Sequence, residues 1–309
     1  MAADAAGRLI HIFNTWTLRG LPAWSAAPTR ADPRAAVAAI VHAGYAGLQV
    51  EPGDPLMDAG FQAGVLMHAS GRLTDPARAR DMVAEHKERG FGLTTLHLGT
   101  GFESVAEGHA LVEAVLEASQ AYRYGLYVET HRATLTQDPR RTLDLIARYP
   151  QLRLNGDFSH WYCGCEMRYG DWDRKLDLLQ PVFERVRYLH GRIADSGALQ
   201  VAVTDLDAPH VRDARQLWTR AMAGFLDHSL RGEMLYFAPE LLPNRLAVDG
   251  ATVYPAYARQ RIGDDGLAED DCDRWQQALL LSRIASDCFG DAAGVTGGAC
   301  GRDAPCEIS

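Results

Sequence analysis

The chain has 309 residues, of which 47% are hydrophobic and 23% are charged. This composition is typical of a globular protein and excludes a disordered, collagen-like or coiled-coil chain. The formal net charge is −9 and no basic tract offsets it, so the sequence argues against a nucleic-acid partner. Only two of the 31 basic residues are lysines, Lys87 and Lys175, which leaves few candidates for Schiff-base chemistry.

The sequence has no apolar run of about 18 residues, the length that a membrane-spanning helix requires. Its first residues also lack the basic and apolar stretches of a signal peptide. We therefore expect a soluble, cytoplasmic protein with no membrane partner. The six cysteines are too sparse for a disulfide framework, and their spacings match no metal or redox motif.

Strand-like apolar segments alternate with longer helical patterns along the chain. The predicted strands are 10–16, 47–51, 93–98, 126–131, 152–158, 186–193 and 234–240. The predicted helices are 33–43, 76–89, 105–124, 139–149, 172–185, 215–228 and 271–289. Three helices begin with an Asp-Pro pair, in which Asp caps the helix and Pro takes its first position. Gly44, Gly90 and Gly125 follow helices, where a glycine often ends the last turn.

This repeated strand-then-helix order predicts a parallel sheet with right-handed crossovers. Seven or eight such units in about 280 residues favour a single (β/α)8 TIM barrel over an open sheet or two domains. We predict that the barrel covers residues 8–290, with its missing strand near 199–203, and that 291–309 is a flexible tail. The segment 241–269 after the last strand is either a lid over the barrel's mouth or a surface insertion without a role.

Polar residues end nearly every predicted strand, and in a barrel these ends meet at one face. Four of them are Glu129, Asp157, His190 and Glu240. Three carboxylates and one imidazole form a mainly oxygen donor set that suits Mn²⁺, Mg²⁺ or Co²⁺ better than a structural Zn²⁺ site. Without a cation the carboxylates would raise each other's pKa values, so we predict one bound divalent metal. The alternative is that the four are separate, solvated loop residues.

Three further residues are expected near the same mouth. His97 and Glu51 point into it if the strands are as predicted, and both are candidate substrate-binding residues. Neighbouring backbone groups are an alternative partner for His97. His131 lies two residues beyond Glu129 on the same face of the strand, so it is a candidate partner of a ligand or a substrate contact.

Four short motifs follow one another along the chain. They are Glu129-Thr130-His131, the Asp-x-x-His from Asp157 to His160, the His-x-Arg from His190 to Arg192, and the strand end Pro239-Glu240. In this order they resemble the xylose-isomerase-like TIM-barrel superfamily, which contains sugar and sugar-phosphate isomerases, epimerases and dehydratases as well as endonuclease IV. Each motif is short, whereas their order is fairly specific. The resemblance covers about residues 10–289.

The resemblance implies one divalent metal, commonly Mn²⁺ in the epimerases, with Co²⁺, Mg²⁺ or Zn²⁺ as alternatives. Its four protein ligands would be Glu129, Asp157, His190 and Glu240. The resemblance also implies that His160 and Arg192 contact oxygens of the substrate. Glu129 and Glu240 would act as the catalytic acid and base on opposite faces of the substrate.

Chemistry of this kind is proton transfer next to a carbonyl group. A metal chelated by a carbonyl oxygen and the neighbouring hydroxyl makes the adjacent C–H acidic, and a glutamate removes the proton. Return of the proton to the opposite face is epimerisation, and return to the neighbouring carbon is isomerisation. We expect an isomerase or epimerase that acts on a sugar, inosose or related polyhydroxy carbonyl compound, with a dehydratase (a lyase) as the alternative. No Gly-rich phosphate cradle favours a phosphorylated sugar over a free one.

Other functions of the same superfamily fit the residues less well. Xylose isomerases proper use an active-site lysine, and neither Lys87 nor Lys175 lies at a predicted strand end. An endonuclease IV-like phosphodiesterase needs further ligands, which His97 and His68 could supply, but the net charge of −9 argues against DNA. A metal-binding barrel without catalysis is a further alternative. Barrels of this kind often form homodimers, although no residue here indicates one.

Overall fold

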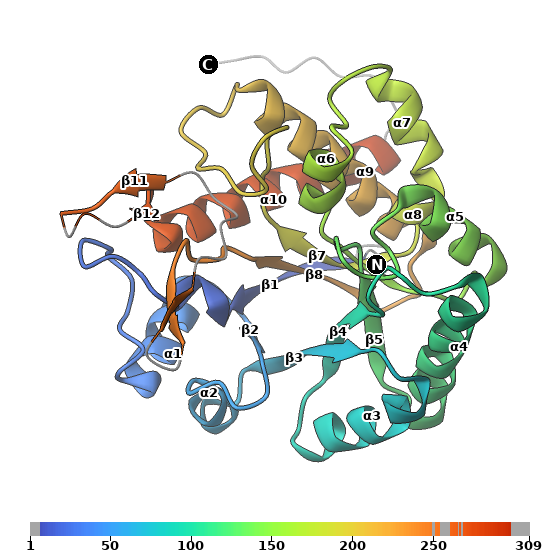
Figure 1. Ribbon diagram of the computed structural model, residues 1–309, viewed down its shortest axis with the longest axis horizontal. Helices are drawn as coiled ribbons and strands as arrows, with labels where there is room; N and C mark the ends of the chain where they lie inside the picture. The colour runs from blue at the N-terminus through green and yellow to red at the C-terminus, as the bar shows by residue number, and fades with distance from the viewer. Residues whose placement is uncertain (1–6, 249–250, 254–259, 265, 267, 298–309) are drawn as a thin grey trace.

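Eight parallel strands form the closed barrel that the sequence predicts (Figure 1). The computed structural model describes residues 7–248, 251–253, 260–264, 266 and 268–297. Neighbouring strands pair in chain order, and the last barrel strand pairs with the first. The strands are β1 (Arg8–Asn14), β2 (Gly47–Val50), β3 (Leu66–Leu73), β4 (Leu93–Leu98), β5 (Gly125–Glu129), β6 (Leu154–Gly156), β7 (Val186–Gly191) and β8 (Met234–Pro239).

Helices surround the barrel (Figure 1). They are η1 (Thr15–Leu18), α1 (Pro33–His42), α2 (Met57–Ala63), η2 (Pro76–Arg78), α3 (Ala79–Glu88), α4 (Val105–Tyr122), α5 (Pro139–Arg148), α6 (Ser159–Gly164), α7 (Trp172–Leu178), α8 (Gln180–Phe183), α9 (Pro209–His228) and α10 (Arg274–Gly297). The Asp side chains of the Asp-Pro pairs accept hydrogen bonds from backbone N–H groups of the first turns, as predicted. Gly44 and Gly90 have positive φ. The prediction for Gly125 is wrong, because Arg123 takes the left-handed position after α4 and Gly125 begins β5.

One barrel strand lies elsewhere than the sequence indicates. The missing strand is β3, over Leu66–Leu73, whose segment contains a glycine and no β-branched residue, so its composition is not that of a strand. The predicted strand at 199–203 does not join the barrel. Its Gln200 instead exchanges hydrogen bonds with the backbone of Leu242, which ties the connection between β7 and α9 to the segment after β8.

The side chains inside the barrel change from apolar to polar along the strands. An apolar cluster fills the interior toward the amino ends; its buried members are Ile12, Leu93, Tyr188 and Ala238. The next inward residues toward the carboxyl ends are polar and buried; they are Asn14, Gln49, Thr95 and Asn155. A second and larger apolar core packs the outer faces of the strands against the helices. The polar part of the interior therefore lies at the end where TIM-barrel sites form.

The segment after β8 packs against the loop that follows β1. It contains two short strand pairs, β9 (Leu246–Val248) with β10 (Ala251–Val253) and β11 (Gln260–Ile262) with β12 (Ala268–Asp270). Trp24 Nε1 donates to Glu269 Oε1 at 3.3 Å, and the Arg261 guanidinium lies 4.8 Å from the centroid of the Trp24 ring. Part of 241–269 lies outside the described residues, and its role as a lid stays a prediction.

The last helix is longer than predicted. Helix α10 continues to Gly297, so residues 291–297 are helical and the predicted boundary at 290 is wrong. Small residues fill this part of the helix, and the buried Ala292 shows that a small side chain can face the core without an obvious apolar period. The rest of the predicted tail, 298–309, lies outside the described residues. Among the helices that the structure describes, none combines the length and apolar character of a membrane span.

Candidate metal centre

Four titratable side chains meet at the carboxyl ends of β5 to β8. Glu129 ends β5, His190 lies in β7, and Asp157 and Glu240 directly follow β6 and β8. One donor atom from each residue lies within 4.8 Å of those of the other three. His190 Nδ1 is 3.2 Å from Glu129 Oε2 and 3.4 Å from Glu240 Oε2. The structure thus brings together the four predicted metal ligands, termed here the four-ligand cluster.

The four-ligand cluster is almost sealed from water. Glu129 and His190 are 1% exposed, Asp157 is 0% exposed, and the Glu240 side chain is 13% exposed. Burying ionised carboxylates is costly unless an opposite charge lies close. Arg192 supplies one such charge, because its Nη2 donates to Asp157 Oδ2 and, at 2.8 Å, to Glu240 Oε2. Three carboxylates and one guanidinium still leave the cluster short of positive charge.

A layer of neutral polar side chains lies beneath the cluster. This polar floor consists of Asn14, Gln49, Thr95 and Asn155. Gln49 Nε2 donates to Thr95 Oγ1 at 2.7 Å, and the same amide contacts His190 Nε2, with Oε1 at 3.0 Å and Nε2 at 2.9 Å. His190 Nε2 therefore faces the polar floor, and its Nδ1 faces the carboxylates.

The polar floor also orients two of the carboxylates. Asn155 Nδ2 donates to Glu129 Oε2 at 3.1 Å, and Asn14 Nδ2 contacts Glu240 Oε1 at 3.3 Å. The sequence analysis missed these residues, because a neutral amide inside a strand has no pattern that separates it from other buried polar residues. The one sequence feature that could have identified them is their position on the strands, which places their side chains inside the barrel.

Two carboxyl groups of the cluster, those of Glu129 and Asp157, are ionised despite their burial. Burial raises the pKa of Glu129, but the His190 and His97 rings lower it by more, to well below its ordinary value. Burial likewise raises the pKa of Asp157, and the charge of Arg192 lowers it far below its ordinary value. The cluster therefore presents negative charge at neutral pH.

The atoms of the cluster fit a divalent cation. Burial lowers the pKa of His190, but the carboxylates of Glu240 and Glu129 raise it to about 9. Glu129 Oε1 is buried and has no hydrogen-bond partner among the described residues. A divalent cation would satisfy this oxygen, replace the second proton of His190 and offset the carboxylates. The oxygen and imidazole donors are also those that such cations prefer.

Three histidine rings stack beside the cluster. The His131 ring lies between the other two, with centroids 4.1 Å from His97 and 3.9 Å from His160. His97 Nε2 is 3.4 Å from Glu129 Oε2, and His160 Nε2 is 3.4 Å from Asp157 Oδ2. Burial lowers the pKa of His131 to about 3, so its ring is neutral. The structure thus brings the three predicted histidines of the mouth to one side of the cluster.

Two other residues named from the sequence lie apart from the cluster. Glu51 pairs with Arg19 at 3.0 Å, and no contact between described residues joins it to the four ligands. His68 faces the apolar part of the barrel, where its ring centroid is 4.6 Å from that of Tyr236. The hypothesis that His68 is an additional metal ligand is therefore wrong.

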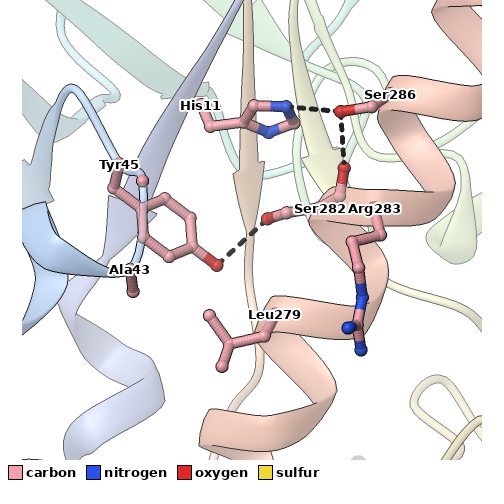
Figure 2. Close-up of a pocket in the computed structure, with 8 residues that line it drawn as sticks. His11, Ala43, Tyr45, Leu279, Ser282, Arg283 and Ser286 are labelled. Carbon is pink, nitrogen blue, oxygen red and sulfur yellow. Dashed lines mark hydrogen bonds between the residues drawn. The ribbon is translucent and has the colours of Figure 1, made fainter.

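A separate pocket of about 350 Å³ lies outside the barrel, between the end of α1 and α10 (Figure 2). Two pairs of its polar groups contact each other: His11 Nε2 lies 2.9 Å from Ser286 Oγ, and the Tyr45 hydroxyl lies 3.0 Å from Ser282 Oγ. It shares no residue with the four-ligand cluster. The candidate functional site of this chain is therefore at the barrel's mouth.

No family model and no curated protein matches this sequence. Among solved structures, a sugar phosphate isomerase/epimerase from Parabacteroides distasonis ATCC 8503 is 12% identical with a TM-score of 0.50, and the match covers 94% of this chain and 99% of that one. The probable 3-DHS dehydratase AsbF from Bacillus anthracis is 12% identical with a TM-score of 0.47, covering 75% of this chain and 92% of that one. A probable 2-pyrone-4,6-dicarboxylic acid hydrolase from Acinetobacter baumannii is 10% identical with a TM-score of 0.47, covering 96% and 100%.

At such identities a structural likeness concerns the fold and leaves the reaction open. The match to the Parabacteroides structure extends over nearly the whole of both chains. The comparison therefore supports the fold alone, and the chain is a closed (β/α)8 barrel.

Proposed function

We propose that this protein is a divalent-metal-dependent isomerase or epimerase that acts on a sugar, inosose or related polyhydroxy carbonyl compound. The observation that carries the proposal is the four-ligand cluster, which gathers ionised carboxylates at the barrel's mouth and leaves the buried Glu129 Oε1 without a hydrogen-bond partner among the described residues. Buried polar atoms in a purely structural cluster are usually satisfied. An unsatisfied carboxylate oxygen at this end of a TIM barrel therefore favours a metal site with a catalytic role.

The residues of the mouth divide into metal ligands and substrate contacts. The four-ligand cluster would hold the metal, which when bound would polarise a carbonyl group of the substrate. Arg192 lies against two of the ligands and is placed to stabilise negative charge that develops on the substrate oxygen. The rings of His131 and His160 are placed to exchange hydrogen bonds with substrate hydroxyls.

Glu129 and Glu240 are the acid and base in this proposal. Their carboxylates approach His190 Nδ1 from two different strand ends, β5 and β8. The Glu240 side chain is 13% exposed and that of Glu129 is 2% exposed, so Glu240 is the more open to the mouth. We assign to Glu240 the removal of the proton next to the carbonyl, and to Glu129 the delivery of a different proton, passed to it from His97, to the opposite face; exchange of His97 and Glu240 with solvent then restores both groups.

Solvent exchange tests this reaction directly. Metal-reconstituted protein is incubated in D₂O with a panel of ketoses and inososes, and the products are analysed by NMR. We expect deuterium at the carbon next to the carbonyl in an isomerised or epimerised product. Glu240→Gln should abolish incorporation even at saturating metal. Glu88→Gln, a matched change at an exposed position at the end of α3, is the control and should retain it.

Other outcomes would change the assignment. A dehydrated enone would replace the proposal with the dehydratase alternative, which uses the same residues. Cleavage of abasic DNA without exchange into any carbonyl substrate would contradict the proposal and favour the phosphodiesterase. Metal binding without turnover of any substrate would indicate a non-catalytic barrel.

A further inference from the structure

Strand β3 brings one more charged side chain, Arg72, to the mouth of the barrel. Alternate residues of a strand face the same side, and His68 faces the interior, so Arg72 does as well. Arg72 is the register partner of His97 on β4, and its Nη2 lies 3.3 Å from His97 Nδ1. The other nitrogen of that ring is 3.4 Å from Glu129 Oε2. Arg72 is therefore linked to the four-ligand cluster through one imidazole.

Arg72 differs from Arg19 and Arg192 in its partners. Arg19 pairs with two carboxylates, at 3.0 Å and 3.2 Å. Arg192 pairs with two ligands of the cluster. Over the ranges that the structure describes, no carboxylate oxygen lies within 4.0 Å of a nitrogen of Arg72, and the residue is exposed to solvent. Its charge is thus available to a ligand.

The charge balance of the metal-loaded site also favours an anionic ligand. The three carboxylates of the four-ligand cluster would be balanced by Arg192 together with a divalent cation. Arg72 then leaves a surplus of positive charge at the mouth. In a chain whose formal net charge is −9, such a local surplus favours an anionic ligand over a neutral one.

We propose that Arg72 binds an anionic group of the substrate, either a carboxylate or a phosphate, while the carbonyl end of the substrate lies at the four-ligand cluster. This inference rests on the proposed function and adds to it the charge of the substrate. A guanidinium donates two parallel hydrogen bonds to either anion. The contact with His97 Nδ1 holds the guanidinium on the side of the mouth that faces Glu129. The sequence shows no Gly-rich phosphate cradle, and the sequence analysis did not identify β3. It therefore gave no indication of an anion site at Arg72.

Three small hydroxyketones test the proposal by isothermal titration calorimetry on Mn²⁺-loaded protein. Dihydroxyacetone is neutral, hydroxypyruvate carries a carboxylate, and dihydroxyacetone phosphate carries a phosphate. We expect at least one of the two anions to bind about tenfold or more tightly than dihydroxyacetone. The anion that binds more tightly than dihydroxyacetone shows whether Arg72 binds a carboxylate or a phosphate. Arg72→Gln should remove the preference, and Arg72→Lys should retain part of it.

Arg89→Gln is the matched control, because Arg89 is an exposed arginine at the end of α3 and its loss should leave the preference unchanged. Equal affinities for neutral and anionic ligands would overturn the inference, as would a preference that survives Arg72→Gln or binding of none of the three. Metal content and D₂O exchange are measured on the same samples. Protein that holds metal and exchanges protons without an anion preference would keep the proposed function and lose this inference. Protein that holds no metal would lose both.

Discussion

Two neutral residues determine which ring nitrogen of His190 faces the carboxylates. Gln49 Oε1 and Asn155 Nδ2 lie 3.0 Å and 3.2 Å from His190 Nε2, which leaves Nδ1 for the carboxylates. The His160 ring has a different position, since it contacts Asp157 and Arg192 without reaching the centre of the four-ligand cluster. Substitution of a metal ligand and substitution of His160 should therefore have different effects on metal binding.

Asp157→Asn and His190→Ala should lose the metal, because each removes a donor of the four-ligand cluster. His160→Ala should keep the metal and lose turnover, with metal affinity lowered by about 10- to 100-fold at most. Elemental analysis of each purified variant, together with the D₂O exchange assay, separates the two effects. If His160→Ala empties the site as fully as His190→Ala does, the division between ligand and substrate contact is wrong.

His68 should make the stability of the protein depend on pH. Burial lowers its pKa from 6.5 to about 3, so the folded chain keeps the ring neutral while the unfolded chain protonates it below its ordinary pKa. Between these values the unfolded state binds more protons, and the free energy of unfolding therefore falls as the pH falls. This contribution is fully present above the unfolded pKa.

His68→Gln should remove that pH dependence. Between pH 7 and pH 5 the wild type should lose about 2 kcal/mol of stability relative to the variant, on the basis of about 1.4 kcal/mol per pH unit. Urea unfolding of both proteins at the two pH values measures the change, and comparison within each pH cancels the effect of other groups. A difference that does not change with pH would contradict the assignment of a buried, neutral ring.

The sequence reveals some of these residues and hides others for a physical reason. Acids and histidines at strand ends form short motifs in a definite order along the chain, so the four ligands could be predicted. Gln49 and Asn155 could not, because their role depends on the residue across the barrel. Arg72 was missed for another reason, since its position at the mouth is defined only once β3 is known.

At the scale of secondary-structure elements, Arg274 joins three segments of the chain. It is fully buried at the start of α10, and its Nε donates to Asp270 Oδ2 at 2.7 Å. Its Nη1 donates to the carbonyl of Thr17, after β1, at 2.8 Å and contacts that of Leu241, after β8, at 3.4 Å. One guanidinium thus holds the long segment after β8 against the first and last strands of the barrel.

Arg274→Leu should destabilise the protein by about 3 kcal/mol, because it leaves Asp270 buried without its cation. Arg283→Leu is the control on the same helix, at an exposed position, and should change stability by about 0.5 kcal/mol or less. Urea unfolding gives both values. Limited proteolysis should also cut the Arg274 variant faster within 241–270. Equal stabilities of the two variants would contradict this role.

The elements that the sequence misplaced share a cause. Pattern reading relies on β-branched residues in strands and on apolar periods in helices. Strand β3 lacks the first, and the last turns of α10 consist mainly of small residues and lack the second. Both elements are defined by the neighbours that they pack against, β2 and β4 in one case and α9 in the other.

At the scale of the whole molecule, the apolar residues that stabilise the barrel lie apart from the polar residues of the candidate metal site. Apolar residues fill the interior toward the amino ends of the strands and the layer beneath the helices, whereas polar and charged residues occupy the carboxyl ends. The cost of burying the carboxylates at the mouth is offset locally by Arg192, by the polar floor and, in this account, by a divalent metal. The central claim is therefore that the four-ligand cluster is a metal site.

Elemental analysis of protein purified without a chelator tests that claim most directly. We expect about one equivalent of a divalent transition metal or Mg²⁺ per chain, and its loss from Asp157→Asn. Protein that has lost metal during purification should regain about one equivalent of added Mn²⁺ and unfold at a higher temperature when it does. Less than about a tenth of an equivalent, with no uptake and no change in Tm on addition of Mn²⁺, Co²⁺, Mg²⁺ or Zn²⁺, would contradict it.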